Sequence, residues 1–291
     1  MNLFSIISEL EKVDPETLER LSHRRSALSA LGNLGKKMAL AAAPVAIGSA
    51  FNQALGQNTL TAANDILNYA LLLEYLEEDF YAQALAAPTL AANLASGSAA
   101  RAAIQTIKNH ETAHVNLLKA ALGANANPRP ANGFNFGSAF ATYASFLTLA
   151  QAFEDTGVRA YKGQAGNIPR TLNPTVGGAQ VNLLTVALQI HSVEARHAAH
   201  VRYLRRGAAA GNQTTIQPWI TGAQANGAPA DVYGAGNPVN LFPADDNVMQ
   251  NNLNLTTALG TMYTAAEVSE AFDEGLDNTT VTRIARLAAT F

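Results

Sequence analysis

Four long segments of the chain carry apolar residues at spacings of three and four, the periodicity of an amphipathic α-helix. They cover residues 61–86, 98–121, 138–164 and 179–206, and all are rich in Ala and Leu. Pro88 and Gly123 follow the first two segments, and Gly207 is expected to cap the fourth. These segments show no alternating strand pattern, so the sequence predicts an all-α fold.

The second and third segments are joined by residues 123–137, which include Pro128 and Pro130. Helix connections in bundles usually take about 2–8 residues. A longer connection favours a crossover along the length of a bundle. We therefore predict an antiparallel four-helix bundle over residues 58–207.

The last part of the chain has a different composition from the bundle. Residues 208–254 are dense in Asn, Gly and Pro, and helical patterns return at 265–275 and 279–289. Asp277 or Asn278 could cap the last helix. The sequence predicts that residues 208–291 form an irregular tail, with short helices, that wraps the bundle.

Residues 1–57 allow two interpretations. Asp14–Pro15 is typical of a helix start, which predicts a helical arm. Arg24 and Arg25 also lie in a segment that resembles a twin-arginine export signal. The protein is accordingly expected to be either cytoplasmic or exported to the periplasm. The apolar stretch over residues 38–51 is shorter than the about 20 residues of a spanning helix, so we predict no membrane span.

The charge composition narrows the possible partners. The chain has 19 Lys and Arg against 22 Asp and Glu, a net charge of −3, which makes a nucleic-acid partner unexpected. Charged residues make up only 14% of the chain, which favours self-association, here expected through the arm and the tail. Cysteine is absent from the sequence, so any metal must be held by His, Asp and Glu.

Each of the four helical segments carries a glutamate near its middle, on the apolar face. These are Glu74, Glu111, Glu154 and Glu194, and His114 and His197 follow the second and the fourth three residues later. Unpaired carboxylates in an apolar core are costly, and four together repel one another. Two divalent cations would cancel four carboxylates, and the two imidazoles would complete the coordination.

The spacing of these residues repeats along the chain. Tyr81 follows Glu74 by seven residues, as Tyr161 follows Glu154. Residues three apart share a helix face, so each Glu–His pair can hold one ion. The two tyrosines either pack in the core or donate a hydrogen bond to a ligand carboxylate. The chain thus contains the same helix pair twice.

Glu77 is a further acidic residue near the face of the first helix, and it could replace Glu74 as a ligand. Its counterpart in the second repeat is Gly157. Because the repeat would then be broken, the pattern favours Glu74, with Glu77 beside the ligands.

At these residues the sequence resembles the ferritin-like superfamily of di-iron carboxylate proteins, and within it a bacterial branch that includes desiccation-related proteins. The resemblance covers residues 58–207. It implies a four-helix bundle with two metal ions, most often iron. It also implies single-helix ligands at Glu74 and Glu154, and bridging carboxylates at Glu111 and Glu194.

The resemblance implies oxidation of Fe(II) by O₂ or peroxide, as in a ferroxidase or a peroxide-detoxifying protein. Two manganese ions in the same ligands would instead imply catalase-like chemistry. A structural, self-assembling protein with little turnover is an alternative of another class. His110–His114 also matches the H-E-x-x-H zinc-protease pattern, but His110 has no counterpart in the second repeat, where Val193 stands. The remaining alternative is a metal-free bundle.

Overall fold

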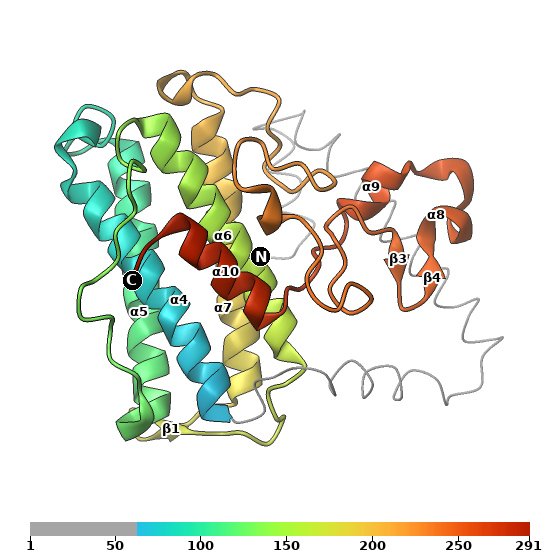
Figure 1. Cartoon of the computed structure of the whole chain (residues 1–291), viewed down its shortest axis with the longest axis horizontal. Coiled ribbons are helices and arrows are strands. Elements are labelled where there is room, and N and C mark those ends of the chain that lie inside the picture. Colours follow the sequence, from blue (N-terminus) through green and yellow to red (C-terminus); the bar gives the residue numbers. More distant parts are fainter. Residues whose placement is uncertain (1–62) are drawn as a thin grey trace, which may run out of the picture.

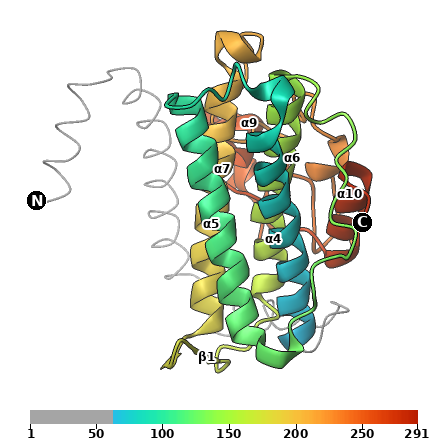
Figure 2. The same ribbon diagram turned by 90° about the vertical axis from the view of Figure 1, so that its left-hand side faces the viewer.

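Four long helices lie side by side and form the body of the molecule (Figure 1). The structure is a computed structural model that describes residues 63–291. The helices are α4 (Ala63–Ala86), α5 (Ala99–Leu122), α6 (Tyr143–Ala165) and α7 (Leu183–Arg205). The views in Figures 1 and 2 show their axes roughly aligned, so the predicted all-α four-helix bundle is confirmed.

Side-chain caps set where three of these helices begin. Ser98 accepts a hydrogen bond from the Arg101 amide at the start of α5. Thr142 and Ser145 form a capping box before α6, and Asn182 accepts from the Thr185 amide before α7. The third and fourth helices therefore begin four to five residues later than the sequence pattern predicted.

A short hairpin lies before α7, and its second strand takes up residues 179–180, where the sequence analysis expected the start of the fourth helix. Strand β1 (Thr175–Val176) pairs with β2 (Ala179–Gln180) in antiparallel register. Gly177 and Gly178 turn the chain with φ of +58° and +85°, a conformation that favours glycine. At its other end α7 stops at Arg205, and Gly207 has φ of −73°, so the expected left-handed glycine cap was wrong.

The connection from α5 to α6 runs the length of the bundle, as predicted (Figure 2). It begins with the 3₁₀ turns of Gly123–Asn125 and lies along α4. Hydrogen bonds join Asn127 to Asn68 at one end of α4 and Gln83 to Phe134 further along. Thr89 then donates to the Phe140 carbonyl beyond the other end. We call residues 123–142 the crossover.

The tail, residues 208–291, packs against α6 and closes on the crossover. Its elements are 3₁₀ turns at Ala208–Ala210, Ala230–Val232 and Gly260–Met262, the hairpin β3 (Met249–Gln250) and β4 (Leu253–Asn254), and helices α8 (Leu255–Ala258), α9 (Ala265–Ser269) and α10 (Asn278–Ala288). Asp277 caps α10, one of the two caps expected. Beyond α10, Thr290 and Asn135 exchange backbone hydrogen bonds.

The helix expected over 265–275 is shorter in the structure. It ends at Ser269, and the chain then extends past α6. A Cβ atom on Gly163 of α6 would lie 2.0 Å from the Leu276 carbonyl oxygen, and one on Gly275 would lie 2.9 Å from the Gly163 Cα. Two backbones meet here, which needs glycine on both sides.

Among residues 63–291, no helix combines the length and hydropathy needed to cross a membrane. The helical arm and the export signal, over residues 1–57, lie outside the described residues. Self-association through the arm and tail stays a prediction.

Candidate metal centre

Six buried residues converge at mid-height in the bundle. Glu74 comes from α4, Glu111 and His114 from α5, Glu154 from α6, and Glu194 and His197 from α7. The four carboxylates have no exposed surface, and the histidines are 9% and 4% exposed. The structure thus brings together all six residues that the sequence analysis singled out.

These residues form two overlapping groups, each with ligand atoms within 4.8 Å of one another. One group is Glu74, Glu111, His114 and Glu194, and the other is Glu111, Glu154, Glu194 and His197. Glu111 and Glu194 belong to both. Each group therefore has three carboxylates and one imidazole, and two carboxylates lie between the groups. We call the six residues the cluster.

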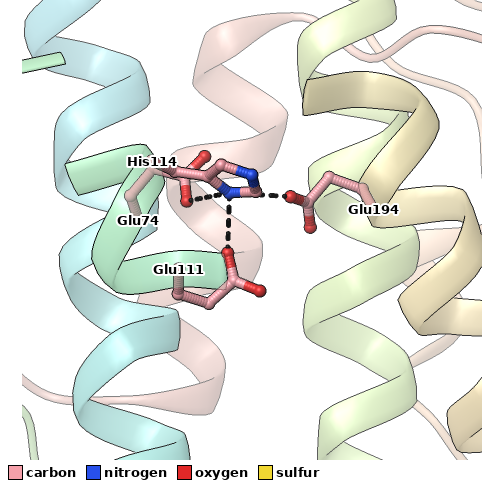
Figure 3. A group of neighbouring side chains, drawn as sticks. All are labelled: Glu74, Glu111, His114 and Glu194. Atoms are coloured by element: carbon pink, nitrogen blue, oxygen red, sulfur yellow. Dashed lines mark hydrogen bonds and ion pairs between the residues drawn. The ribbon is translucent and has the colours of Figure 1, made fainter. Parts of the chain in front are cut away.

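His114 lies at the centre of the first group (Figure 3). Its Nδ1 atom is 3.1 Å from Glu74 Oε2, 2.9 Å from Glu111 Oε2 and 3.4 Å from Glu194 Oε1. The three carboxylates come from three helices and point at one nitrogen. An ion at this position would meet the same oxygens.

His197 has the equivalent place in the second group. Its Nδ1 atom is 2.9 Å from Glu111 Oε1 and 3.2 Å from Glu154 Oε2. Its other ring nitrogen, Nε2, lies 2.9 Å from Nδ1 of His110. A hydrogen bond at that nitrogen orients the ring and holds Nδ1 toward the carboxylates.

Two buried tyrosines hold the outer carboxylates across the bundle. The Tyr81 hydroxyl of α4 donates to Glu154 of α6, and the Tyr161 hydroxyl of α6 donates to Glu74 of α4. The pair obeys the twofold repeat seen in the sequence. Each tyrosine fixes the orientation of the carboxylate that belongs to the other half.

Burial and the neighbouring charges shift the pKa values of the cluster residues. Burial disfavours the charged form of His114 and His197, but the neighbouring carboxylates outweigh it and raise the pKa of both to about 10. Burial raises the pKa of Glu74 to about 7 and that of Glu194 well above its usual range. For Glu111, contact with the two histidines outweighs burial and lowers the pKa to about 2. The buried carboxylates thus favour the binding of positive charge, whether as protons or as cations.

Three buried carboxylate oxygens accept no well-aligned hydrogen bond from the described residues, although two of them are in ion-pair contact with a histidine. They are Glu111 Oε1 and both oxygens of Glu194, which belong to the two carboxylates shared by the groups. Buried polar atoms are nearly always paired, so such oxygens are suited to contact a cation. Carboxylate and imidazole donors suit divalent iron, manganese or zinc. The arrangement is compatible with a dinuclear metal site.

Glu77 is a fifth buried carboxylate beside the cluster, outside both groups. Burial, together with Glu154, Glu111 and Glu74, raises its pKa well above the usual range. A Cβ atom on Gly157 would lie 3.4 Å from Glu77 Oε1 and 3.1 Å from Glu194 Oε2. The glycine that breaks the sequence repeat therefore leaves space for the extra carboxylate.

The geometry disfavours the zinc-protease interpretation. That motif needs His110 and His114 on one ion, but only His114 belongs to a ligand group among the described residues. His110 instead contacts His197 and is largely exposed. Its support of His197 could not be read from the repeat, because Val193 takes its place in the second half.

One comparison with known proteins gives a match. The family model described as a ferritin-like domain matches residues 62–206, the stretch that contains α4 to α7 and the whole cluster. It does not distinguish a desiccation-related branch. No curated protein and no solved structure matches the chain. Through residues 62–206, the chain belongs to the ferritin-like superfamily.

Proposed function

We propose that the cluster binds two iron ions and that the protein oxidises Fe(II) with an oxygen-derived oxidant, as a ferroxidase does. The observation that carries this proposal is the sharing of Glu111 and Glu194 by both ligand groups. Shared carboxylates allow two ions to lie close together. The oxygens of these two residues that accept no well-aligned hydrogen bond would be available to both ions.

Charge supports two ions rather than one. Two divalent cations cancel the four carboxylates, and the histidines then need no proton to balance the core. Each histidine offers Nδ1 to one group, which gives every ion one imidazole. When bound, a pair of iron ions supplies one electron from each ion to an oxidant.

The protein residues position this chemistry. Tyr81 and Tyr161 hold Glu154 and Glu74, the carboxylates that each serve one group. Glu77 adds a carboxyl group that can hold a proton close to the shared Glu194. The apolar faces of the helices exclude bulk water, which strengthens each interaction between charges in the cluster.

The same donors would accept two manganese ions, which is the catalase-like alternative. The structural alternative draws on the tail for contacts with neighbours. In this chain, however, the tail docks on its own bundle, which leaves less of it for other copies.

Anaerobic titration with Fe(II) or Mn(II), followed by elemental analysis, tests the proposal. We expect about two ions per chain, and oxidation of the iron-loaded protein when an oxidant is added. Glu111→Gln should weaken binding of both ions by about 100-fold or more, beyond what loss of an outer hydrogen bond costs. Asp65→Asn, an exposed change on α4, is the matched control. Failure of the wild-type protein to retain metal would exclude the proposal.

A further inference from the structure

The two histidines of the cluster differ in what meets their outer ring nitrogen, Nε2. In each of them Nδ1 contacts the carboxylates. Nε2 of His197 lies 2.9 Å from Nδ1 of His110, an exposed residue of α5. Among the described residues, no hydrogen bond reaches Nε2 of His114, whose polar contacts are at Nδ1. The two halves of the bundle thus differ directly behind the imidazole ligands.

The contact between His110 and His197 has the geometry of a hydrogen bond in the plane of both rings. The ring planes differ by only 12°, and the centroids are 5.1 Å apart. That separation corresponds to the 2.9 Å between the nitrogens plus about one ring radius on each side, so the rings lie edge to edge. When Nδ1 of His197 holds an ion, the one ring proton is on Nε2, and it is donated to Nδ1 of His110. His110 therefore fixes which side of the His197 ring faces the carboxylates.

The sequence repeat explains why His114 has no such partner. Val193 takes the place of His110 in the second half of the repeat, 83 positions later. The same step of 83 positions leads from His114 to His197. By the repeat, Val193 is therefore the residue that corresponds to a partner of His114. A valine side chain accepts no hydrogen bond, so the protein gives His197 a support that it does not give His114.

The carboxylates do not create this difference. Each group has three carboxylates and one imidazole, and each outer carboxylate accepts a hydrogen bond from one tyrosine. Glu77 also breaks the repeat, but it borders Gly157 together with Glu194, which both groups share. The side chains of His114 and His197 are 11% and 5% exposed, so the outer nitrogen of His114 is left to water. Of these features, the contact with His110 is the one that serves a single ion position.

We propose that His110 is a positioning residue that makes the two ion positions unequal, so that the position beside His197 fills first and holds its ion more tightly than the position beside His114. The inference rests on the proposed function, in which the cluster binds two ions. A ligand histidine that donates its outer N–H to a fixed acceptor is already oriented and is a stronger ligand. Losing such an acceptor typically costs about 10- to 100-fold in metal affinity. We expect a preference of about tenfold, since water partly replaces the acceptor at His114.

Crystals of the protein loaded with one equivalent of Mn(II) test this inference, because anomalous scattering gives the occupancy of each position. In the wild type we expect about ten times more manganese beside His197 than beside His114. His110→Ala leaves Nε2 of His197 to water, as at His114, so the two occupancies should become about equal. Equal occupancies in the wild type, or an unchanged preference in His110→Ala, would overturn the inference.

Two further variants separate the hydrogen bond from a general effect on the fold. His110→Gln keeps an acceptor at the exposed position and should retain part of the preference. His200→Ala removes an exposed histidine of α7 whose ring contacts Tyr203, and it should leave the preference unchanged. If His110→Ala instead lowered both occupancies alike, together with the melting temperature, His110 would have only a structural role.

The converse change gives the first half the partner that it lacks. Val193→His places an imidazole at the position that the repeat assigns to a partner of His114, so the occupancies should again become about equal. Calorimetric titration with Mn(II) distinguishes the two routes, because total affinity should rise in Val193→His and fall in His110→Ala. A preference in Val193→His that matched the wild type would contradict the inference. A wild-type protein that retained no metal would refute the proposed function as well, whereas two ions held equally would refute this inference alone.

Discussion

Two equivalent stripes on the outer faces of α4 and α6 differ in what they hold. Residues 71, 75, 79 and 83 of α4 correspond to residues 151, 155, 159 and 163 of α6, each 80 positions later. The first stripe faces the crossover and the second faces the tail. Toward the core, by contrast, the two helices present the same Glu and Tyr. The repeat is kept at the cluster and lost where other chain segments dock.

The stripe on α4 uses few polar contacts, and they lie near the surface. Arg129 of the crossover pairs with Asp79 and donates to the Tyr75 carbonyl. Gln83 donates to the Phe134 carbonyl. The Asp79 and Arg129 side chains remain 25% and 31% exposed, so solvent screens this pair.

In the stripe on α6, Gln151, Asp155 and Arg159 are all buried. Arg159 has no exposed surface, and it donates to backbone carbonyls of the tail at Val232, Gly234, Pro243 and Glu274. Asp155 accepts from the Tyr233 hydroxyl and pairs with Arg202 of α7. A charged stripe that would ordinarily face water has here become the interior of an interface. The comparison teaches that the same helix position can serve as surface or as core, depending on what the chain lays over it.

Replacing the central residue of each stripe should give the largest difference. Arg159→Met leaves several tail carbonyls without a donor and Asp245 without its ion-pair partner, so we expect a loss of about 3 to 5 kcal/mol in unfolding free energy. Asp79→Asn should cost about 1 kcal/mol or less. Urea unfolding of both variants measures the difference. Similar losses in the two would mean that the tail does not depend on its buried arginine.

The tail side should also contribute to the pH dependence of stability, through Asp245. Burial raises the pKa of Asp245 to about 7, and Arg159 at 3.4 Å offsets this only in part. Because the folded state then keeps a proton that the unfolded state loses above about pH 4, stability should fall between about pH 4 and 7, by about 2 to 4 kcal/mol.

The difference between wild type and Asp245→Asn isolates this contribution, with Asp246→Asn at the exposed neighbouring position as control. Unfolding in urea at several pH values measures it. If the wild type instead gained stability over Asp245→Asn as pH rose, Asp245 would be an ordinary ionised partner of Arg159.

The close contact of two backbones should give the next effect. Gly163→Ala puts a methyl group 2.0 Å from the Leu276 carbonyl oxygen, so the tail must shift, at a cost of about 1 to 3 kcal/mol. Gln83→Ala, at the equivalent position of α4, loses one partly buried hydrogen bond and should cost about 1 kcal/mol. Thermal unfolding followed by circular dichroism distinguishes the two. An unchanged melting temperature for Gly163→Ala would show that the contact is loose.

The smallest expected effect concerns the two tyrosines of the cluster, which occupy equivalent positions in the two halves of the bundle. Tyr81→Phe and Tyr161→Phe each free one carboxylate from its donor, so each should weaken metal binding by about tenfold. Calorimetric titration with Mn(II), which is not oxidised under anaerobic conditions, measures this. Equal losses would support a symmetric site, whereas a loss in only one variant would indicate that the two ions are held differently.

The bundle and the cluster could be predicted because their signals are local and repeated. Helical periodicity predicts the four segments. The glutamates stand out because a charge on an apolar helix face is costly unless it is paired; they are Glu74, Glu111, Glu154 and Glu194. Helix starts were displaced because short polar caps such as Thr142 and Asn182 outweigh the apolar pattern.

The docking of the tail could not be predicted in the same way. Arg159 and Asp155 look like solvent-facing residues, and the carbonyls that Arg159 contacts lie 73 to 115 residues later. In the sequence, Gly157 is the counterpart of Glu77, and this difference already indicated that the two halves are not identical at this position.

The enclosure of α6 by the tail affects how this protein can be dissected. The family match stops at residue 206, and a fragment cut there would expose the face that carries Arg159 and Asp155. Such a fragment would expose unpaired charges and apolar side chains that the tail normally covers, and we expect it to aggregate. We therefore expect that a piece able to fold on its own must include the tail that covers α6, so the bounds of the family match and of the folding unit differ.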